Sequence, residues 1–178
     1  MELPTRNNFF AGRLLTAEDL TAEQNYFLGR LRRHNRLLHG SGVVQGLDVS
    51  LTGDTTAPSV AVGPGYALDP LGNEICVCAA TALPLPQKGT SVHVVICHRE
   101  CPTDPVPVPS DPAEPDSTTK PSRIADTFEL LLSAASPQRR AGLCGEVSSG
   151  ERGVPLARLR FSRRRWRVDR RFRVPRAR

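Results

Sequence analysis

The hydrophobic pattern of this chain changes at Gly40-Ser-Gly42, and that change limits its possible folds more than any other feature. Before it, apolar residues recur at the spacing of one helix face. After it, they occur in short runs separated by glycine and proline, which is typical of β-strands joined by turns. The sequence therefore predicts an α+β chain, in which an N-terminal arm and a long amphipathic helix precede a small antiparallel β-sheet or barrel domain.

A single helix is predicted over residues 17–39. Thr16 and Asp19 form a near capping box at its start, where they bind free N–H groups and place negative charge at the positive helix end. Gly40 is free to adopt the left-handed conformation that ends many helices. The apolar stripe contains Leu20, Phe27, Leu28, Leu31, Leu37 and Leu38. The other face carries Glu23, Arg30, Arg32, Arg33 and Arg36, and we expect it to be either solvated or docked on an acidic partner.

The remainder of the chain contains seven runs with the composition of strands. They are Val43–Leu51, Ser59–Val62, Glu74–Ala79, Val92–His98, Asp126–Leu132, Val154–Phe161 and Trp166–Val174. Both faces of Val92–His98 carry apolar side chains, so this strand should be central in its sheet. The last two runs alternate apolar residues with arginine and are separated by Ser162-Arg163-Arg164, which predicts a hairpin with an arginine-lined surface.

Residues 102–121 contain seven prolines, several acids and no aromatic residue. Proline removes a ladder hydrogen bond, so we expect this segment to form neither a ladder nor a core, but an extended loop with some polyproline II character. A chain of 178 residues suits one compact domain or a domain with arms. The predicted parts are 1–40 (arm and helix), 41–161 (antiparallel β domain including the Pro-rich loop) and 162–178 (Arg-rich C-terminal extension).

The basic character of the chain belongs to its C-terminal segment. The net charge is +6, yet residues 158–178 alone contain eleven arginines and one acid, Asp169, so the preceding part is net negative. Arginines that alternate with apolar residues suit bidentate contacts to carboxylates of a protein neighbour. Neutralisation of phosphates, with Trp166 and Phe172 stacking on bases, is the nucleic-acid alternative. The predicted contact residues are Arg30, Arg33, Arg36, Arg163, Arg164, Arg165, Arg167, Arg170 and Arg171.

One cysteine cluster resembles a metal site. Cys76, Cys78, Cys97 and Cys101 could surround a tetrahedral zinc, which leaves a small zinc-stabilised domain as a further alternative. The spacing is not that of a C-x2-C motif, and buried small thiols are the ordinary explanation, so no metal is expected. A cysteine nucleophile paired with His93 or His98 has still less support.

The chain carries no Walker loop, dinucleotide fingerprint, Gly-x-Ser-x-Gly elbow or His-Glu-x-x-His zinc signature, so an enzyme would need a site that none of these motifs indicates, and no cofactor is expected. Asp69 and Glu74 flank a turn whose composition explains them without catalysis. His34 and His39 are five residues apart, which on an α-helix places them on different faces and argues against a shared metal. We expect His39 to bind terminal carbonyls or to stack at the junction of helix and sheet.

The N-terminal part carries a long and specific motif. Its positions are Phe10, Gly12, Leu14, Leu15, Thr16, Ala17, Asp19, Glu23, Gln24, Tyr26, His34, Asn35, Arg36, Leu38, His39, Gly40, Gly42, Val43, Val44, Gly46 and Leu47. This motif resembles proteins encoded with phage tail-like contractile injection systems. In that family a segment of the type F-x-G-x-L-L-T-A-x-D-F leads into E-Q-x-Y, a basic helix and H-N-R-x-L-H-G-x-G-V-V-x-G-L. Leu20 stands where the family usually has Phe.

Later segments extend this resemblance over nearly the whole chain. Residues 63–74 look like the P-G-x-A-x-D-x-x-G-x-E turn of fibre and baseplate modules, 122–129 like S-R-I-x-E-x-F-E, and 154–158 like V-x-L-A-x-V. The resemblance implies a non-enzymatic structural part of a contractile particle at a baseplate, fibre-attachment or cap position. It also implies other subunits of the particle as partners and a homo-oligomer within the assembly.

No segment suits a membrane span or a secretory signal. A spanning helix needs about 20 apolar residues, whereas the mean hydropathy here is −0.31 and the apolar runs are short. The first ten residues include Arg6 but no apolar run. Cysteines without a signal indicate reduced thiols. We therefore expect a cytoplasmic protein that assembles into a tail-like particle.

Overall fold

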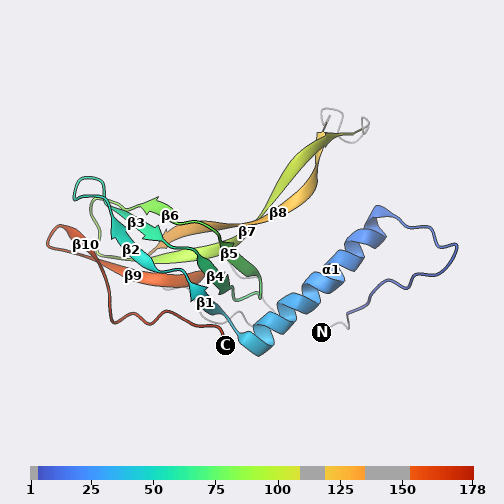
Figure 1. Ribbon diagram of the computed structural model, residues 1–178, viewed down its shortest axis with the longest axis horizontal. Helices are drawn as coiled ribbons and strands as arrows, with labels where there is room; N and C mark the ends of the chain where they lie inside the picture. Colours follow the sequence, from blue (N-terminus) through green and yellow to red (C-terminus); the bar gives the residue numbers. More distant parts are fainter. Residues whose placement is uncertain (1–3, 109–118, 135–152) are drawn as a thin grey trace.

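The computed structural model of the protein describes residues 4–108, 119–134 and 153–178 (Figure 1). This part contains helix α1 (Ala17–His34), one π-helical turn η1 (Asn35–His39) and ten strands. The strands are β1 (Gly42–Gly46), β2 (Val49–Thr52), β3 (Ser59–Val62), β4 (Gly65–Leu68), β5 (Glu74–Val77), β6 (Thr81–Pro84), β7 (Ser91–Pro107), β8 (Thr119–Ser133), β9 (Val154–Ser162) and β10 (Arg165–Val168).

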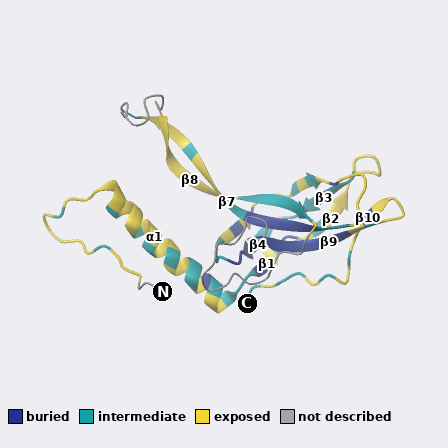
Figure 2. Ribbon diagram, turned by 180° about the vertical axis from the view of Figure 1, so that it is seen from behind, coloured by how far each residue is buried: buried dark blue, intermediate teal, exposed yellow. Residues whose placement is uncertain are grey.

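The strands form three antiparallel sheets around one core. Their strand orders are β1-β4-β5, β2-β3-β6 and β10-β9-β7-β8. Val60 and Val62 alternate along β3 with half-buried residues, so one face of the strand points into the core. The side chains of Val94 and Ile96 on β7 and Leu159 on β9 complete the centre and are fully buried. Figure 2 shows that the buried residues gather in this β body, whereas α1 lies largely exposed beside it.

The predicted α+β architecture is wrong. Strands form 48% of the structure and helices 16%, and the sheet curls, so the chain is mostly β rather than a long amphipathic helix with a small domain. Helix α1 has 18 residues and buries none of them. The helical spacing of apolar residues indicates a stripe but does not show whether the protein itself covers that stripe. In addition, strands of four residues such as β4 and β6 leave too weak a pattern to be predicted.

The ends of the helical segment follow local chemistry. Thr16 Oγ1 accepts a hydrogen bond from Asp19 N at 3.3 Å, and the Asp19 carboxylate accepts one from Thr16 N at 3.2 Å, which confirms the capping box. Gly40 ends the segment at φ 73°. The predicted range 17–39 therefore spans α1 and η1 together. The last five residues form a π-helical rather than an α-helical turn.

The expectation that the proline-rich segment forms no ladder is also wrong. β7 continues to Pro107 and pairs with β8 along its length, as far as the Pro107–Thr119 pair. On its other side β7 pairs with β9 only from Ser91 to Ile96. Beyond Ile96 no described strand pairs with that edge of β7, and proline is tolerated there because no N–H is needed on that side. Of the predicted loop 102–121, residues 109–118 lie outside the described part.

Several predicted strands are confirmed with changed limits. Val92–His98 is the inner part of β7, which lies between β9 and β8 and is therefore central. The terminal hairpin forms as β9 and β10, paired from Ser162–Arg165 to Leu159–Val168, although β10 ends before the predicted Val174. The single run 43–51 becomes two strands in different sheets, because Leu47 adopts φ 58° between them.

The Asp69–Glu74 segment is a turn, as its composition indicates. Asp69 is buried and accepts hydrogen bonds from Leu71 N at 2.8 Å and Asn73 N at 2.9 Å, and from the Asn73 side chain at 2.8 Å. All three donors belong to its own turn, so the carboxylate is fully used in shaping the backbone. Glu74 makes no pair with it and instead accepts from the side chain of Asn35 at 3.3 Å.

No helix in the described ranges has the length and apolar content needed to cross a membrane. The bounds of the three predicted parts, 1–40, 41–161 and 162–178, stay a prediction. Cys144 lies outside the described residues.

His93 should make the stability of the protein depend on pH. Its side chain is buried in β7, and burial lowers its pKa, as does the nearby Arg158 guanidinium. The unfolded chain therefore binds this proton more readily than the folded one. The free energy of unfolding should fall as the pH drops from 7 to 5, through the ordinary histidine range around pH 6.5.

Urea denaturation at several pH values measures the slope of the free energy of unfolding against pH. His93→Gln should flatten it and the exposed His34→Gln should not; equal slopes in all three proteins would contradict the assignment.

Candidate protein docking surfaces

Helix α1 is attached to the β body at its C-terminal end. Asn35 is buried there, and its Nδ2 donates to Gly72 O at 3.1 Å and to Glu74 Oε1 at 3.3 Å. Arg32 forms an ion pair of 2.9 Å with Glu100 of β7. From this attachment the helix projects away from the sheets (Figure 1). Within the described part of the chain no residue of α1 is buried, so the helix has exposed surface for contacts with other proteins.

The chain terminus reinforces the same attachment. Arg178 N donates to His39 O at 2.9 Å, and His39 Nδ1 lies 2.8 Å from Arg178 O. Val43 N donates to Pro175 O at 2.8 Å, which fixes the terminal segment beside β1. His39 thus meets a carbonyl at the junction of helix and sheet, but this carbonyl belongs to Arg178 and not to the end of the helix. The expectation that His34 and His39 lie on different faces is wrong, since their ring centroids are 5.3 Å apart. A π-helical turn brings residues five apart onto one face.

The N-terminal arm folds back on the start of α1. Asn7 N donates to Glu23 Oε2 at 3.2 Å, and Asn7 Nδ2 donates to Asp19 O at 2.5 Å. Arg13 forms an ion pair of 2.5 Å with Asp19, the same carboxylate that caps the helix. Asp19 therefore joins the arm to the helix, so the two present one continuous surface.

This surface is strongly apolar and exposed. We define the arm–helix surface by the large apolar residues of the arm, α1 and η1 that are at least 44% exposed. They are Phe9, Phe10, Leu14, Leu15, Leu20, Phe27, Leu28, Leu31, Leu37 and Leu38. Monomeric proteins rarely expose so many large apolar side chains on adjoining elements, and such patches mark interaction sites. The predicted apolar stripe of the helix is thus present, but it faces outward.

The predicted helix arginines border shallow grooves at the end of this surface. Arg30 and Arg33 line a groove of about 260 Å³ together with His34, Leu37 and Leu38. Arg36 lines a second groove, of about 430 Å³, with Pro175, Arg176 and Arg178. Arg30 lies 5.8 Å from the centre of the Tyr26 ring. None of the three arginines has an ion pair within the described residues, so their charges are available to a partner.

The arginines of the terminal hairpin, β9 and β10, divide into two groups. Arg158 and Arg160 lie 4.0 Å and 2.8 Å from the carboxylate of Asp169, whose side chain is 9% exposed. This internal contact links the end of β10 back to β9. The second group is Arg163, Arg164, Arg165, Arg167, Arg170 and Arg171, whose side chains have no ion pair in the part of the chain described. No carboxylate among the described residues pairs with them, and their role as contact residues stays a prediction.

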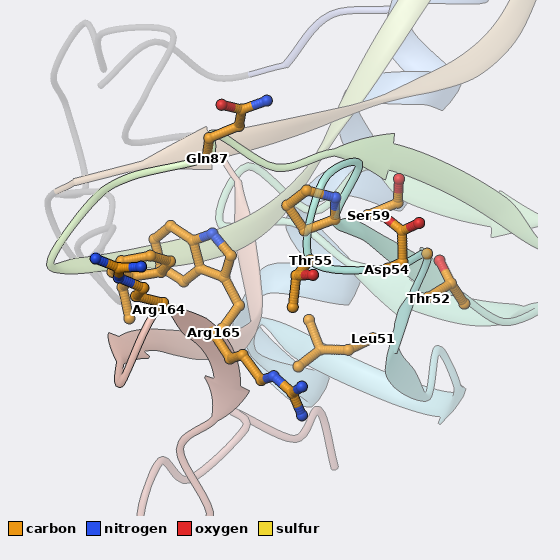
Figure 3. A pocket seen from close by; sticks show the side chains of 12 residues that line it. Leu51, Thr52, Asp54, Thr55, Ser59, Gln87, Arg164 and Arg165 are labelled. Atoms are coloured by element: carbon orange, nitrogen blue, oxygen red, sulfur yellow. The ribbon is translucent and has the colours of Figure 1, made fainter.

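Two of these arginines border a pocket between the terminal hairpin and the β2–β3 turn (Figure 3). The pocket has a volume of about 320 Å³, and we call it the arginine pocket. Its lining residues are Leu51, Thr52, Gly53, Asp54, Thr55, Pro58, Ser59, Gln87, Phe161, Arg164, Arg165 and Trp166. Trp166 is buried and packs on Phe161 at 5.2 Å between ring centres, while its Nε1 donates to Pro86 O at 2.7 Å. The pocket therefore has a rigid aromatic wall and a cationic edge.

The turn that presents these arginines is strained. Arg163 and Arg164 adopt φ values of 51° and 60°, which Asn and Gly adopt at lower cost than arginine does. The double variant Arg163→Asn, Arg164→Gly should raise the free energy of unfolding by about 1 to 2 kcal/mol. Urea denaturation measures this change. Arg165→Asn, in the adjoining strand, should give no such gain; a double variant no more stable than the parent would show that the turn carries no strain.

The four cysteines of the zinc alternative do not come together as one site. Cys76 and Cys78 are exposed with sulfurs 3.8 Å apart, whereas Cys97 is buried and Cys101 is exposed farther along β7. Burial raises the pKa of the Cys97 thiol, which disfavours the reactive thiolate. Within the described residues, the group of possible metal ligands with atoms inside 4.8 Å of one another is His98, Glu100 and Asp126, which contains no cysteine. Its Glu100 is the partner of Arg32.

Sequence reasoning missed the residues that attach the helix and those that build the pocket. Asn35 belongs to the H-N-R segment of the resemblance, but nothing in its neighbourhood indicates that it is buried against Gly72. Gly53-Asp54 in the sequence does indicate the turn between β2 and β3. Its position opposite the terminal hairpin depends on how the sheets pack, which local sequence does not encode.

Comparison with known proteins supports the fold. No protein family and no curated protein matches the chain by sequence. The crystal structure of TssK is similar with a TM-score of 0.52 and 15% identity, over 93% of this chain and 41% of that one.

Two structures of type VI secretion assemblies are similar as well. A chain of the TssK–TssF–TssG baseplate subcomplex gives a TM-score of 0.54 and 14% identity over 96% of this chain and 61% of that one. A chain of the type VI secretion baseplate complex gives 0.51 and 10%, over 98% and 60%. This chain spans less than two thirds of each of these proteins. The three TM-scores show that this chain shares its fold with components of a type VI secretion baseplate, a phage tail-like system.

Proposed function

We propose that this protein is a non-enzymatic structural subunit of a phage tail-like contractile injection system, at a baseplate, fibre-attachment or cap position. It acts by docking to neighbouring subunits and forms a homo-oligomer within the cytoplasmic assembly. The observation that carries the proposal is the state of α1. The helix is attached to the β body at one end, yet it buries none of its residues and exposes its apolar side chains.

The energetics of the arm–helix surface favour a covered state. Burying one Leu or Phe side chain contributes about 1.5 to 3 kcal/mol, so covering even a few of the ten exposed residues supports a stable contact. Arg30, Arg33 and Arg36 lie beside this surface and have no ion pair among the residues described. They would fix the orientation of an acidic neighbour, while the apolar residues supply most of the affinity.

The comparisons and the sequence support this function from separate directions. The fold neighbours are baseplate components of a phage tail-like secretion system, and the N-terminal motifs resemble those of contractile injection proteins. The fold does not favour the alternative of a nucleic-acid-binding module. Trp166 is only 6% exposed and its N–H is bonded to Pro86 O, so little of its ring is available for base stacking.

Substitution of the arm–helix surface tests the proposal. The triple variant Leu20→Gln, Phe27→Gln, Leu31→Gln should keep the stability of the isolated protein within about 1 kcal/mol, because these side chains are at least 46% exposed. It should fail to co-purify with sheath and tube proteins from the producing cells. The control is Ile124→Gln, which removes an apolar side chain of β8 that is 68% exposed and lies outside the arm–helix surface. Unchanged incorporation of the triple variant would contradict docking through this surface.

A further inference from the structure

The arginine pocket has the features of a site for an acidic peptide. Arg164 and Arg165 border it, and neither has an ion pair within the described ranges. Arg163 and Arg167 adjoin them in sequence and add to the positive charge. Leu51, Pro58 and Phe161 supply an apolar lining. A pocket of about 320 Å³ lies at the small end of ligand sites, which fits a short segment of chain rather than a large cofactor.

The single acid in the pocket does not cancel this charge. Asp54 Oδ1 accepts hydrogen bonds from Thr56 N and Ala57 N, both at 2.8 Å, and from Thr56 Oγ1 at 2.6 Å. These bonds hold the carboxylate within its own turn and lower its pKa. Gln87 Nε2 donates to Thr56 O at 3.2 Å and secures the same turn. The pocket is thus preorganised with its arginines free.

The chain itself contains a segment of matching charge. Residues 109–118, which we call the acidic connection, have the sequence Pro-Ser-Asp-Pro-Ala-Glu-Pro-Asp-Ser-Thr, with three acids and no basic residue. They join the distal ends of β7 and β8. Figure 1 shows that these two strands extend from the β body away from the turn between β9 and β10. The ends of β7 and β8 that flank the acidic connection in sequence therefore lie away from the β9–β10 turn of the same copy.

We infer that the arginine pocket binds the acidic connection of a second copy of this chain, with Arg164 and Arg165 contacting carboxylates among Asp111, Glu114 and Asp116. Charge-assisted hydrogen bonds from arginine to carboxylate supply both strength and orientation. A proline-rich segment also loses little conformational entropy when it binds in an extended form.

The contact joins two different surfaces, so it is heterologous. Such a contact generates a closed ring when the rotation between copies closes, and an open chain when it does not. The inference deepens the proposed docking function by naming one partner. The contact between pocket and acidic connection is tested on the isolated protein. It can therefore be absent while the proposed docking function is correct, and it can be present while the proposed docking function is wrong.

Trp166 gives a direct readout, because it is the single tryptophan of the chain and lines the pocket. The probe is a synthetic peptide of residues 108–118 with blocked ends. Titration into the full chain should change the Trp166 emission in a saturable manner. The same peptide with Asp111→Asn, Glu114→Gln and Asp116→Asn should leave the emission unchanged. A decathymidine oligonucleotide should also have no effect; if it saturates the signal and displaces the peptide, nucleic acid is the occupant and the inference is overturned.

Matched charge reversals separate this site from general attraction to a basic segment. Arg164→Glu with Arg165→Glu should weaken peptide binding about a hundredfold, at roughly tenfold for each charge-assisted contact. Arg170→Glu with Arg171→Glu changes the net charge equally but lies outside the pocket lining, and it should weaken binding only a few-fold. Equal losses in both variants would overturn the inference.

A charge swap in the full-length protein completes the test. One variant carries Arg164→Glu and Arg165→Glu, and the other carries Asp111→Lys, Glu114→Lys and Asp116→Lys. Light scattering should show that the parent self-associates with rising concentration and that each variant alone does not. An equimolar mixture should associate again, since each pocket then meets a connection of opposite charge. A parent that stays monomeric at all concentrations, or a mixture that stays dissociated, would overturn the inference.

Discussion

Gly72→Ala is expected to lower the free energy of unfolding by at least about 2 kcal/mol and to loosen α1 from the β body. Gly72 adopts φ 89°, a conformation that costs little only for glycine. A methyl group at this position would also overlap with the carbonyl group of Arg32 in the last turn of α1. The overlap would force the helix away and break the bond from Asn35 to Gly72 O. Urea denaturation measures the stability, and amide hydrogen exchange of residues 32–36 measures the detachment.

Gly29→Ala is the matched control for this substitution. Gly29 lies within α1, and a side chain there would meet no atom within 4 Å. Alanine in a helix interior is more favourable than glycine by roughly 0.5 to 1 kcal/mol, so this variant should be slightly more stable than the parent. If Gly72→Ala proved as stable as Gly29→Ala, the close approach of helix and turn would be wrong.

Trp166→Ala is expected to have the largest effect on stability, about 3 to 5 kcal/mol. The indole is 6% exposed, packs on Phe161 and donates to Pro86 O. Its loss opens a cavity at the junction of β9, β10 and the segment before β7, and it leaves the Pro86 carbonyl without this donor. Typical domains have 5 to 15 kcal/mol of stability in total, so the variant should unfold at a much lower urea concentration.

Two further variants separate packing from hydrogen bonding at this position. Trp166→Phe retains an aromatic side chain but cannot donate to Pro86 O, and it should cost about 1 to 2 kcal/mol. Val168→Ala, at the exposed end of the same strand, should change the stability by less than about 0.5 kcal/mol. A Trp166→Ala protein as stable as Val168→Ala would contradict the burial of the indole.

Features that depend on residues close together in the sequence were predicted correctly. Features that depend on contacts between residues far apart in the sequence were not predicted. The capping box of Thr16 and Asp19 and the end of the helical segment at Gly40 are local, and both are present. The π-helical turn is not local. It contains Asn35, whose buried amide bonds to residues 37 and 39 positions away in the chain. This turn is what places His34 beside His39.

The proline-rich segment shows the same limit. Composition correctly indicates that prolines such as Pro102 and Pro105 cannot occupy the middle of a sheet. It does not reveal that β7 extends beyond its pairing with β9. Among the described strands, the outer part of β7 pairs with β8 alone and therefore tolerates these prolines. The fold class was missed for a related reason, because an exposed apolar stripe and a buried one have the same spacing along α1.

The candidate sites were predicted in part. The free arginines of the terminal hairpin were identifiable because they cluster in a short segment of sequence. The arginine pocket was not, since it combines residues of β2, β3 and the terminal hairpin. The resemblance to contractile injection proteins indicated a system whose baseplate components share this fold. It gave no information on which surface of the molecule is exposed.

The proposed function places this protein in a contractile particle, in contact with its neighbours through the arm–helix surface. Cryo-electron microscopy of particles purified from the producing cells tests it most directly. The predicted result is density for this chain in the particle, with Leu20, Phe27 and Leu31 covered by an adjoining subunit. Complete, contraction-competent particles that lack the chain, or a bound chain whose α1 remains in solvent, would contradict it.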